Sequence, residues 1–125
     1  MAKILAIKEN YLFSKVYSRG KKASEKNVVV YALRNYKSSD TKLGITTGKK
    51  IGNAVMRSRS RRLIREAFRF ASQNKKWKKP FWIVVVARAP IALPGCKMQD
   101  VHRDLEHAFQ KLGLFSEEDN CEPLN

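Results

Sequence analysis

The sequence predicts an α/β (α+β) sandwich in which one small mixed sheet packs against helices, in the order αββαβα. Two observations predict this fold class. Apolar residues recur at helical spacing in three segments, and runs of β-branched residues lie between those segments. The chain has 125 residues, which fits one domain with a single modest core.

The first half of the chain contains one predicted helix and two predicted strands. Residues 8–19 suggest a helix ending at Gly20, which can take the left-handed conformation common after a helix. Residues 27–35 are rich in β-branched and aromatic residues and predict a strand. The polar run 37–41 should turn the chain, so that residues 43–47 return antiparallel to the first strand. The apolar arc of the helix consists of Leu12, Phe13, Val16 and Tyr17.

The second half predicts a long helix, an interior strand and a final helix. The long helix runs from about residue 53 to 72, with Asn53 as a plausible N-cap. Its expected buried stripe is Met56, Ser60, Leu63, Ile64, Ala67, Phe68 and Ala71. Residues 81–87 are apolar on both faces of a strand, which is typical of a strand covered on each side. An amphipathic segment containing Val101 and Leu105 then predicts a last helix that stops at Gly113.

The charge of the chain is strongly positive and unevenly distributed. There are 26 Lys and Arg against 11 Asp and Glu, a net charge of +15, and a polyanion such as nucleic acid is the usual partner. The last ten residues contain no Lys or Arg but four acids, Glu117, Glu118, Asp119 and Glu122. We therefore predict one RNA-binding domain over residues 1–115 and an acidic, solvated, disordered tail over 116–125. An alternative makes the tail an internal competitor for the RNA site.

The most informative segment places eight basic residues and one acid, Glu66, between positions 49 and 69. The basic residues are Lys49, Lys50, Arg57, Arg59, Arg61, Arg62, Arg65 and Arg69. Four of the arginines recur at i, i+4, where like charges repel and weaken an isolated helix. Phosphates would relieve that repulsion, and the planar guanidinium can bind two phosphate oxygens at once. The alternative is a solvated basic face that only keeps the protein soluble.

Aromatic side chains supply a second kind of candidate contact. Phe13 and Tyr17 lie one turn apart on the first helix, and Tyr31 lies on the first strand. Exposed aromatic rings beside a basic surface can stack on unpaired bases, although packing in the core is the more ordinary role. Trp77 stands among four lysines and is expected to be exposed, or else to anchor its loop.

The sequence contains no pattern that predicts catalysis or metal binding by the protein itself. The acids before residue 98 are scattered over different elements. His102 and His107 are five residues apart, which places them about 140° apart on a helix rather than on one ligand-forming face. No nucleophile motif or glycine-rich phosphate loop is present.

The sequence also predicts where in the cell the protein is found and whether its cysteines are oxidised. No apolar run resembles a signal peptide or a membrane span, so we expect a cytoplasmic protein with no membrane partner. Cys96 and Cys121 lack a Cys-x-x-Cys spacing and are expected to be free thiols, although a single bridge is conceivable.

Residues 49–65 read Lys-Lys-Ile-Gly-Asn-Ala-Val-Met-Arg-x-Arg-x-x-Arg-Leu-Ile-Arg, which closely resembles the signature of the bacterial ribonuclease P protein component family. Phe-x-x-Val-Tyr at 13–17, Val-Val-Tyr at 29–31 and Ile-Val-Val-Val-Ala-Arg at 83–88 resemble further parts of that family. The resemblance implies a ribosomal-protein-like α/β sandwich with a left-handed βαβ crossover, the opposite of the general rule for crossover hand. Two departures are Ser58, where the family has Asn, and Gly48, where it has a small polar residue.

The resemblance also implies a function. A catalytic RNA subunit with bound Mg²⁺ removes the 5′ leader of precursor tRNA, and the protein supplies no catalytic residue, metal ligand or small-molecule site. The protein docks on the catalytic RNA and holds the leader in a cleft. Carried over by position, the RNA-binding residues are Lys49, Lys50, Asn53, Arg57, Arg59, Arg61, Arg62 and Arg65, beside Arg69, and the cleft aromatics are Phe13, Tyr17 and Tyr31. Charge and size alone would equally suit a ribosomal or ribosome-assembly protein, and a DNA-binding helix module is a third alternative.

Overall fold

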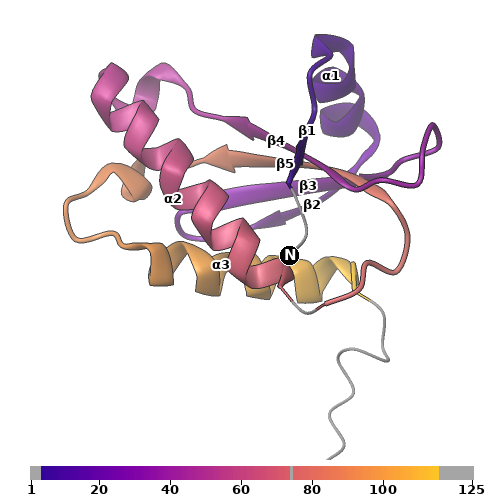
Figure 1. Ribbon diagram of the computed structural model, residues 1–125. Helices are drawn as coiled ribbons and strands as arrows, with labels where there is room; N and C mark the ends of the chain where they lie inside the picture. Colours follow the sequence, from indigo (N-terminus) through magenta and orange to yellow (C-terminus); the bar gives the residue numbers. More distant parts are fainter. Residues whose placement is uncertain (1–3, 74, 116–125) are drawn as a thin grey trace, which may run out of the picture.

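The computed structural model describes residues 4–73 and 75–115, so the acidic segment 116–125 lies outside the described residues. The elements, labelled in Figure 1, are β1 (Leu5–Ala6), α1 (Asn10–Arg19), β2 (Lys21–Ser24), β3 (Val28–Arg34), β4 (Lys42–Thr46), α2 (Ala54–Ser72), β5 (Phe81–Ala87) and α3 (Met98–Leu112). Short 3-10 turns at Lys49–Ile51 and Ala89–Ala92 precede α2 and α3. The predicted α+β class and its mixed sheet are confirmed.

The sheet has the strand order β1-β4-β5-β3-β2. β5 pairs in parallel with β4 and antiparallel with β3, and β1 joins β4 in parallel. The segment 43–47 does run antiparallel to the segment 27–35, as predicted, but the two strands are not paired with each other, because β5 lies between them. β5 is apolar on both faces, and the centre of the sheet is where both faces are covered and both edges are hydrogen-bonded. The chain passes from β4 through α2 to β5, so α2 is the crossover between two parallel neighbours.

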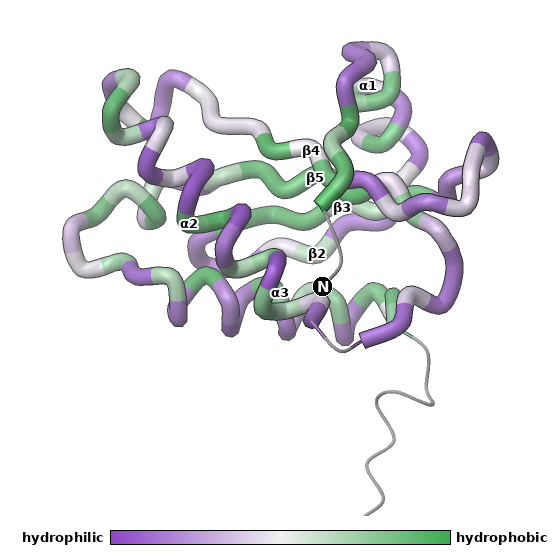
Figure 2. The backbone as a smooth tube through the Cα atoms, viewed as in Figure 1, coloured by the Kyte–Doolittle hydropathy of each residue, from purple (hydrophilic) through white to green (hydrophobic). Residues whose placement is uncertain are grey.

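The helices cover the two faces of the sheet, as Figure 1 shows. α1 lies on one face, where Leu12 and Val16 pack against Trp82 and Val84 of β5. α2 and α3 lie on the other face and form the main core, which contains Ile64, Phe68, Ile83, Val85, Leu105 and Phe109. Alternate residues of β5 thus pack into two different cores, and most of the strand is green in Figure 2.

Two strands were missed by the sequence analysis. β1 has only two residues, and β2 reads Lys-Lys-Ala-Ser with a single buried side chain, Ala23. Both lie at the edges of the sheet, where short length and lysines protect against pairing with other chains. Such strands lack the apolar alternation by which a strand is recognised.

Gly20 ends α1 as predicted, but not in the predicted conformation. Its φ is −78° and its ψ 164°, which is extended backbone rather than left-handed. A Cβ at this position would lie 2.6 Å from the Val16 carbonyl oxygen and 2.8 Å from that of Ala32. Glycine is therefore required by the close approach of α1 to β3. Gly113, by contrast, ends α3 with a φ of 63° and is left-handed as a C-cap.

α2 follows its prediction closely. Its stripe is buried at Ser60, Ile64, Ala67, Phe68 and Ala71, and Leu63 is partly buried against the main core. The exception is Met56 in the first turn, which is 38% exposed. The first turn extends past the edge of the core, so helical periodicity alone overestimated the length of the buried stripe.

Asn53 caps α2, since its side-chain Oδ1 accepts a hydrogen bond of 2.9 Å from the backbone N–H of Met56. Replacing Asn53 with Ala is expected to lower the free energy of unfolding by about 1 kcal/mol, because that N–H loses its partner. Asn53→Asp keeps the acceptor and should be nearly neutral. Urea denaturation of both variants checks the cap, and an equal loss in both would contradict it.

Trp77 was expected to be exposed, and this expectation is wrong. Its ring lies 4.6 Å from that of Phe115 and 5.9 Å, in stacked geometry, from that of Phe68. Phe81 and Phe109 complete the cluster. The alternative role, in which the tryptophan anchors the basic loop, is the one the structure confirms.

Candidate nucleic-acid interface

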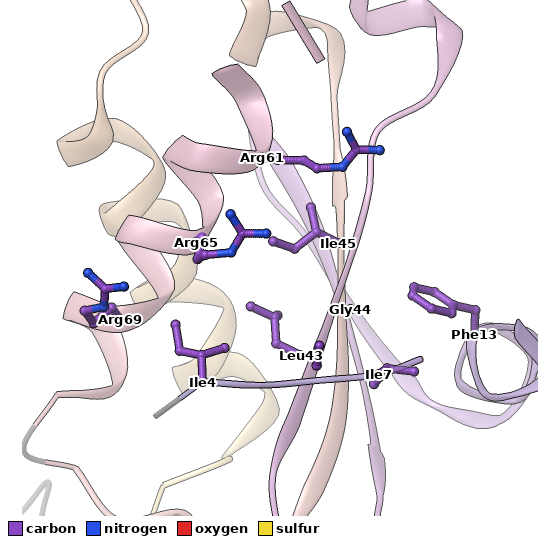
Figure 3. Close-up of a pocket in the computed structure, with 10 residues that line it drawn as sticks. Ile4, Ile7, Phe13, Leu43, Gly44, Ile45, Arg61, Arg65 and Arg69 are labelled. Atoms are coloured by element: carbon purple, nitrogen blue, oxygen red, sulfur yellow. The ribbon is translucent and has the colours of Figure 1, made fainter. Parts of the chain in front are cut away.

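A groove with a volume of about 550 Å³ crosses the β1–β4 edge of the sheet, from α2 on one face to Phe13 of α1 on the other. Its lining residues are Ile4, Ala6, Ile7, Phe13, Leu43, Gly44, Ile45, Arg61, Arg65 and Arg69. Figure 3 shows the three arginines on one side, Phe13 on the other, and between them Leu43 and Ile45 of β4 with Ile4 and Ile7, which flank β1. We call this site the arginine groove. It combines cationic groups with an aromatic ring across an apolar floor.

The arginine side of the groove results from helical spacing, because residues four apart lie on the same face of α2. Arg61 and Arg65 are exposed, as is the neighbouring Arg62. Within residues 4–73 and 75–115, no carboxylate forms an ion pair with any of these three. Arg69 differs, since its Nη1 lies 3.1 Å from Glu66 Oε1. The row therefore carries a positive charge that the described part of the chain does not neutralise.

Arg57 and Arg59 are placed differently from this row. Arg57 Nη1 donates a hydrogen bond of 2.7 Å to the carbonyl oxygen of Gly52, in the turn before α2. Arg59 Nη2 donates one of 2.7 Å to the carbonyl oxygen of Cys96, and thereby ties α2 to the loop before α3. Both side chains support backbone in addition to any contact with a ligand. The sequence pattern could not reveal this, because the acceptors are main-chain groups that any residue provides.

Lys49, Lys50 and Asn53 lie together at the start of α2. Both lysines are exposed on the 3-10 turn Lys49–Ile51, and Asn53 is exposed at the N-cap. The turn is joined to the helix by the bond from Arg57 to Gly52. These predicted residues therefore extend the positive surface of α2 beyond its first turn.

Phe13 is half-buried on α1 and packs directly against β4. A Cβ on Gly44 would lie 2.6 Å from the Phe13 ring, so the absence of a side chain at 44 makes room for the ring. This glycine was not singled out from the sequence, and no sequence signal would have indicated its role.

Tyr17 and Tyr31 lie beside Phe13, on α1 and on β3. Their rings meet edge to face with centroids 5.0 Å apart, and the Tyr17 hydroxyl is 2.7 Å from Thr46 Oγ1. Tyr17 remains 38% exposed, whereas Tyr31 is half-buried against the smaller core. The structure thus brings the three predicted aromatic residues together between α1 and the sheet, where they combine packing with partial exposure.

The groove offers no group suited to acid–base or metal chemistry. Across the described residues there is no cluster of three His, Cys, Asp or Glu side chains that could hold a metal ion. The buried carboxylate of Asp104 accepts hydrogen bonds from the backbone and side-chain N–H groups of Asn27, so its role is structural. His102 lies 3.3 Å from Glu106 on α3, its ring meets that of Phe70 on α2 edge to face, and it does not line the groove.

Two groups have shifted pKa values, and both lie near the start of α3, outside the groove. A hydrogen bond from the Lys97 backbone N–H, followed by one from Arg103, lowers the pKa of the Asp100 carboxyl. Burial raises the pKa of the Cys96 thiol, which is free. These shifts follow from helix capping and packing, so they do not mark a reactive site.

The α+β fold, the cationic row and the neighbouring aromatic rings together are typical of a small RNA-binding protein, and the groove contains no hydrolytic group. None of the helices in the described part of the chain is long and apolar enough to cross a membrane.

We compared the chain with protein families, with known proteins and with solved structures. The family model described as Ribonuclease P matches residues 1–113. The ribonuclease P protein component of Clostridium acetobutylicum is 38% identical over 109 residues, covering 86% of this chain and 88% of the relative. That of Bacillus velezensis is 34% identical over 115 residues, covering 92% and 95%. The solved structure of the Staphylococcus aureus RNase P protein shares 31% identity with a TM-score of 0.76, covering 91% of this chain and all of that one.

The chain belongs to the ribonuclease P protein component family. The resemblance noted in the sequence is thereby confirmed, and with it the role of protein subunit of the ribonucleoprotein endonuclease that matures the 5′ end of tRNA. The ribosomal and DNA-binding alternatives are not supported by these relatives.

Proposed function

We propose that the arginine-rich side of α2 docks on the catalytic RNA while the aromatic side of the groove holds the 5′ leader of precursor tRNA. This proposal rests on one observation: the guanidinium groups of Arg61 and Arg65 are exposed, form no ion pair with any described residue, and lie across an open groove from Phe13. Phosphates can accept the guanidinium hydrogen bonds, and an unpaired base can stack on a ring. The partially exposed Tyr17 extends the aromatic side.

Binding residues are proposed on both sides of β4. The docking set is Lys49, Lys50, Asn53, Arg57, Arg59, Arg61, Arg62, Arg65 and Arg69, and the leader set is Phe13, Tyr17 and Tyr31. Within the docking set, Arg61, Arg62 and Arg65 are the arginines whose guanidinium groups hydrogen-bond to no other side chain or carbonyl in the described part of the chain, so they should contribute most to affinity. Arg57 and Arg59 should contribute mainly by fixing the start of α2 and its neighbouring loop.

The same residues determine how the protein assists the reaction. Mg²⁺ prefers oxygen ligands, and the groove presents arginines and apolar side chains instead, so these residues do not fit the ion. We therefore place Mg²⁺ on the RNA subunit. The protein neutralises phosphate charge and holds the leader, which should strengthen substrate binding and lower the Mg²⁺ concentration that the RNA needs. A tRNA precursor and a catalytic RNA as partners also imply a cytoplasmic location.

Reconstitution with the catalytic RNA of the same source tests this function. Cleavage of precursor tRNA should be stimulated strongly by the protein at low Mg²⁺ and progressively less as Mg²⁺ is raised. If about five cations contact phosphates of a single strand, the logarithm of affinity should fall with that of salt at a slope near −3.5. Cleavage that is unchanged by the protein at every Mg²⁺ concentration would remove the function proposed here.

A further inference from the structure

A second cationic surface lies at the opposite edge of the sheet from the arginine groove. A hollow of about 400 Å³ opens where β2 and β3 meet the loop before β5 and the end of α3. Its five cations, all exposed, are Arg19, Lys21, Arg34, Lys78 and Lys79. We call it the β2–β3 hollow. It shares no lining residue with the groove, which lies on β1 and β4.

The cations of this hollow are not neutralised by the described part of the chain. No acid lines the hollow, and none of the five takes part in an ion pair between described residues. Elsewhere cations on α3 are paired: Lys111 Nζ lies 2.7 Å from Glu25 Oε2, and Arg103 lies 2.8 Å from Asp100. Five converging positive charges repel one another, and an anionic ligand would relieve that repulsion.

The end of α3 does not account for this concentration of charge. A helix C-terminus bears about half a negative charge and favours nearby cations. α3 ends at Leu112, beside the hollow, and Lys111 already stands in its last turn. Half a charge cannot balance five cations, so most of the positive charge in the hollow is available to a ligand.

The shape of the hollow indicates an unpaired strand rather than a duplex. Its floor is apolar and includes Leu33 and Phe81. At its rim the Arg34 guanidinium lies 5.5 Å from the centre of the Tyr36 ring, which is 71% exposed and presents a free aromatic surface. Single-stranded RNA offers both phosphates for the cations and base faces for the apolar and aromatic groups, whereas a duplex hides its base faces.

We propose that the β2–β3 hollow is a second binding site for single-stranded RNA. The protein then contacts RNA at both edges of its sheet and connects two segments. The strand in the hollow is either leader sequence beyond the groove or an unpaired segment of the catalytic RNA. This choice of source rests on the proposed function, whereas binding of an unpaired strand does not.

The test replaces Lys21 and Lys79 together with glutamine and measures binding of a uniform oligouridylate of about 16 nucleotides as salt is varied. Loss of two phosphate contacts should make the salt slope shallower by about 1.4, a loss of about 25-fold near 0.1 M salt relative to 1 M. Lys26→Gln with Lys97→Gln is the matched control, because it removes the same charge from exposed positions outside both sites. Equal losses in the two double variants, or no loss in the first, would overturn the proposal.

Further arms identify the source of the strand. If the lysine double variant binds precursor tRNA more weakly when the leader has about 16 nucleotides but not when it has about 4, the strand in the hollow is the leader. If the lysine double variant loses affinity only for the catalytic RNA, the strand in the hollow belongs to that RNA. Arg61→Gln with Arg65→Gln is measured in parallel to separate the two proposals. If the arginine double variant cleaves normally while the lysine double variant loses affinity for oligouridylate, the proposed function is wrong and the second RNA site is supported. If the arginine double variant loses cleavage while the lysine double variant keeps its affinity for oligouridylate, only the second RNA site is wrong.

Discussion

Replacing Arg61 and Arg65 together with glutamine is expected to remove most of the protein's stimulation of precursor cleavage at low Mg²⁺ while leaving the fold intact. Both side chains are exposed and form no ion pair among the described residues, so the free energy of unfolding should change by only about 0.5 kcal/mol. Two lost phosphate contacts should make the salt slope of affinity shallower by about 1.4. Urea denaturation and salt-dependent binding to precursor tRNA measure the two quantities.

Arg59→Gln is the matched control and should show the opposite pattern. Its guanidinium is partly buried and bonds to the Cys96 carbonyl, so its loss should lower the free energy of unfolding by about 1.5–3 kcal/mol. RNA affinity of the variant that remains folded should fall less than in the double variant. If Arg61 and Arg65 instead prove to hold the fold together, the arginine row is structural and the interface is misassigned.

Gly44→Ala is expected to damage both stability and leader binding. The new Cβ would lie 2.6 and 2.7 Å from atoms of the Phe13 ring, so the ring must leave its place in the groove. Overpacking of this kind typically costs about 1–3 kcal/mol. Leader affinity should fall with it, measured by comparing precursor tRNA with mature tRNA.

Gly48→Ala provides the control for that experiment, because a Cβ there meets nothing within 4 Å and the backbone is extended. Gly48→Ala should change neither the free energy of unfolding nor the affinity for the leader. A second variant, Gly44→Ala with Phe13→Leu, should regain stability without regaining leader affinity. Full recovery of both would mean that the Phe13 ring does not bind the leader.

The helices and the central strand could be predicted because their signals are local. The stripe of α2, the cap at Asn53 and the two apolar faces of β5 each follow from spacing within one segment. The order of the strands could not be predicted in this way. β5 is separated from β3 by β4 and α2, and only tertiary packing decides that it inserts between β3 and β4.

The sequence predicted which residues belong to the candidate site, but not which contacts those residues make in the fold. The spacing of Arg61, Arg65 and Arg69 placed them on one face, and they do line one groove. Arg59 belongs to the same motif yet reaches a distant carbonyl, and Gly44 matters only because Phe13 lies over it. Both relationships connect residues more than thirty positions apart, where a single sequence carries no spacing signal. The β2–β3 hollow escaped notice for the same reason, since its cations come from four separate segments.

The late position of β5 in the chain has a consequence for biosynthesis. Every strand pair that crosses the middle of the sheet includes this strand, and both cores depend on its side chains. A nascent polypeptide that has emerged only as far as α2 can pair β1 with β4 and β2 with β3, but it cannot join the two pairs into one sheet, because β5 is still inside the ribosome. Folding should then be abrupt and nearly all-or-none, with the basic helix exposed to surrounding polyanions until the last third of translation is complete.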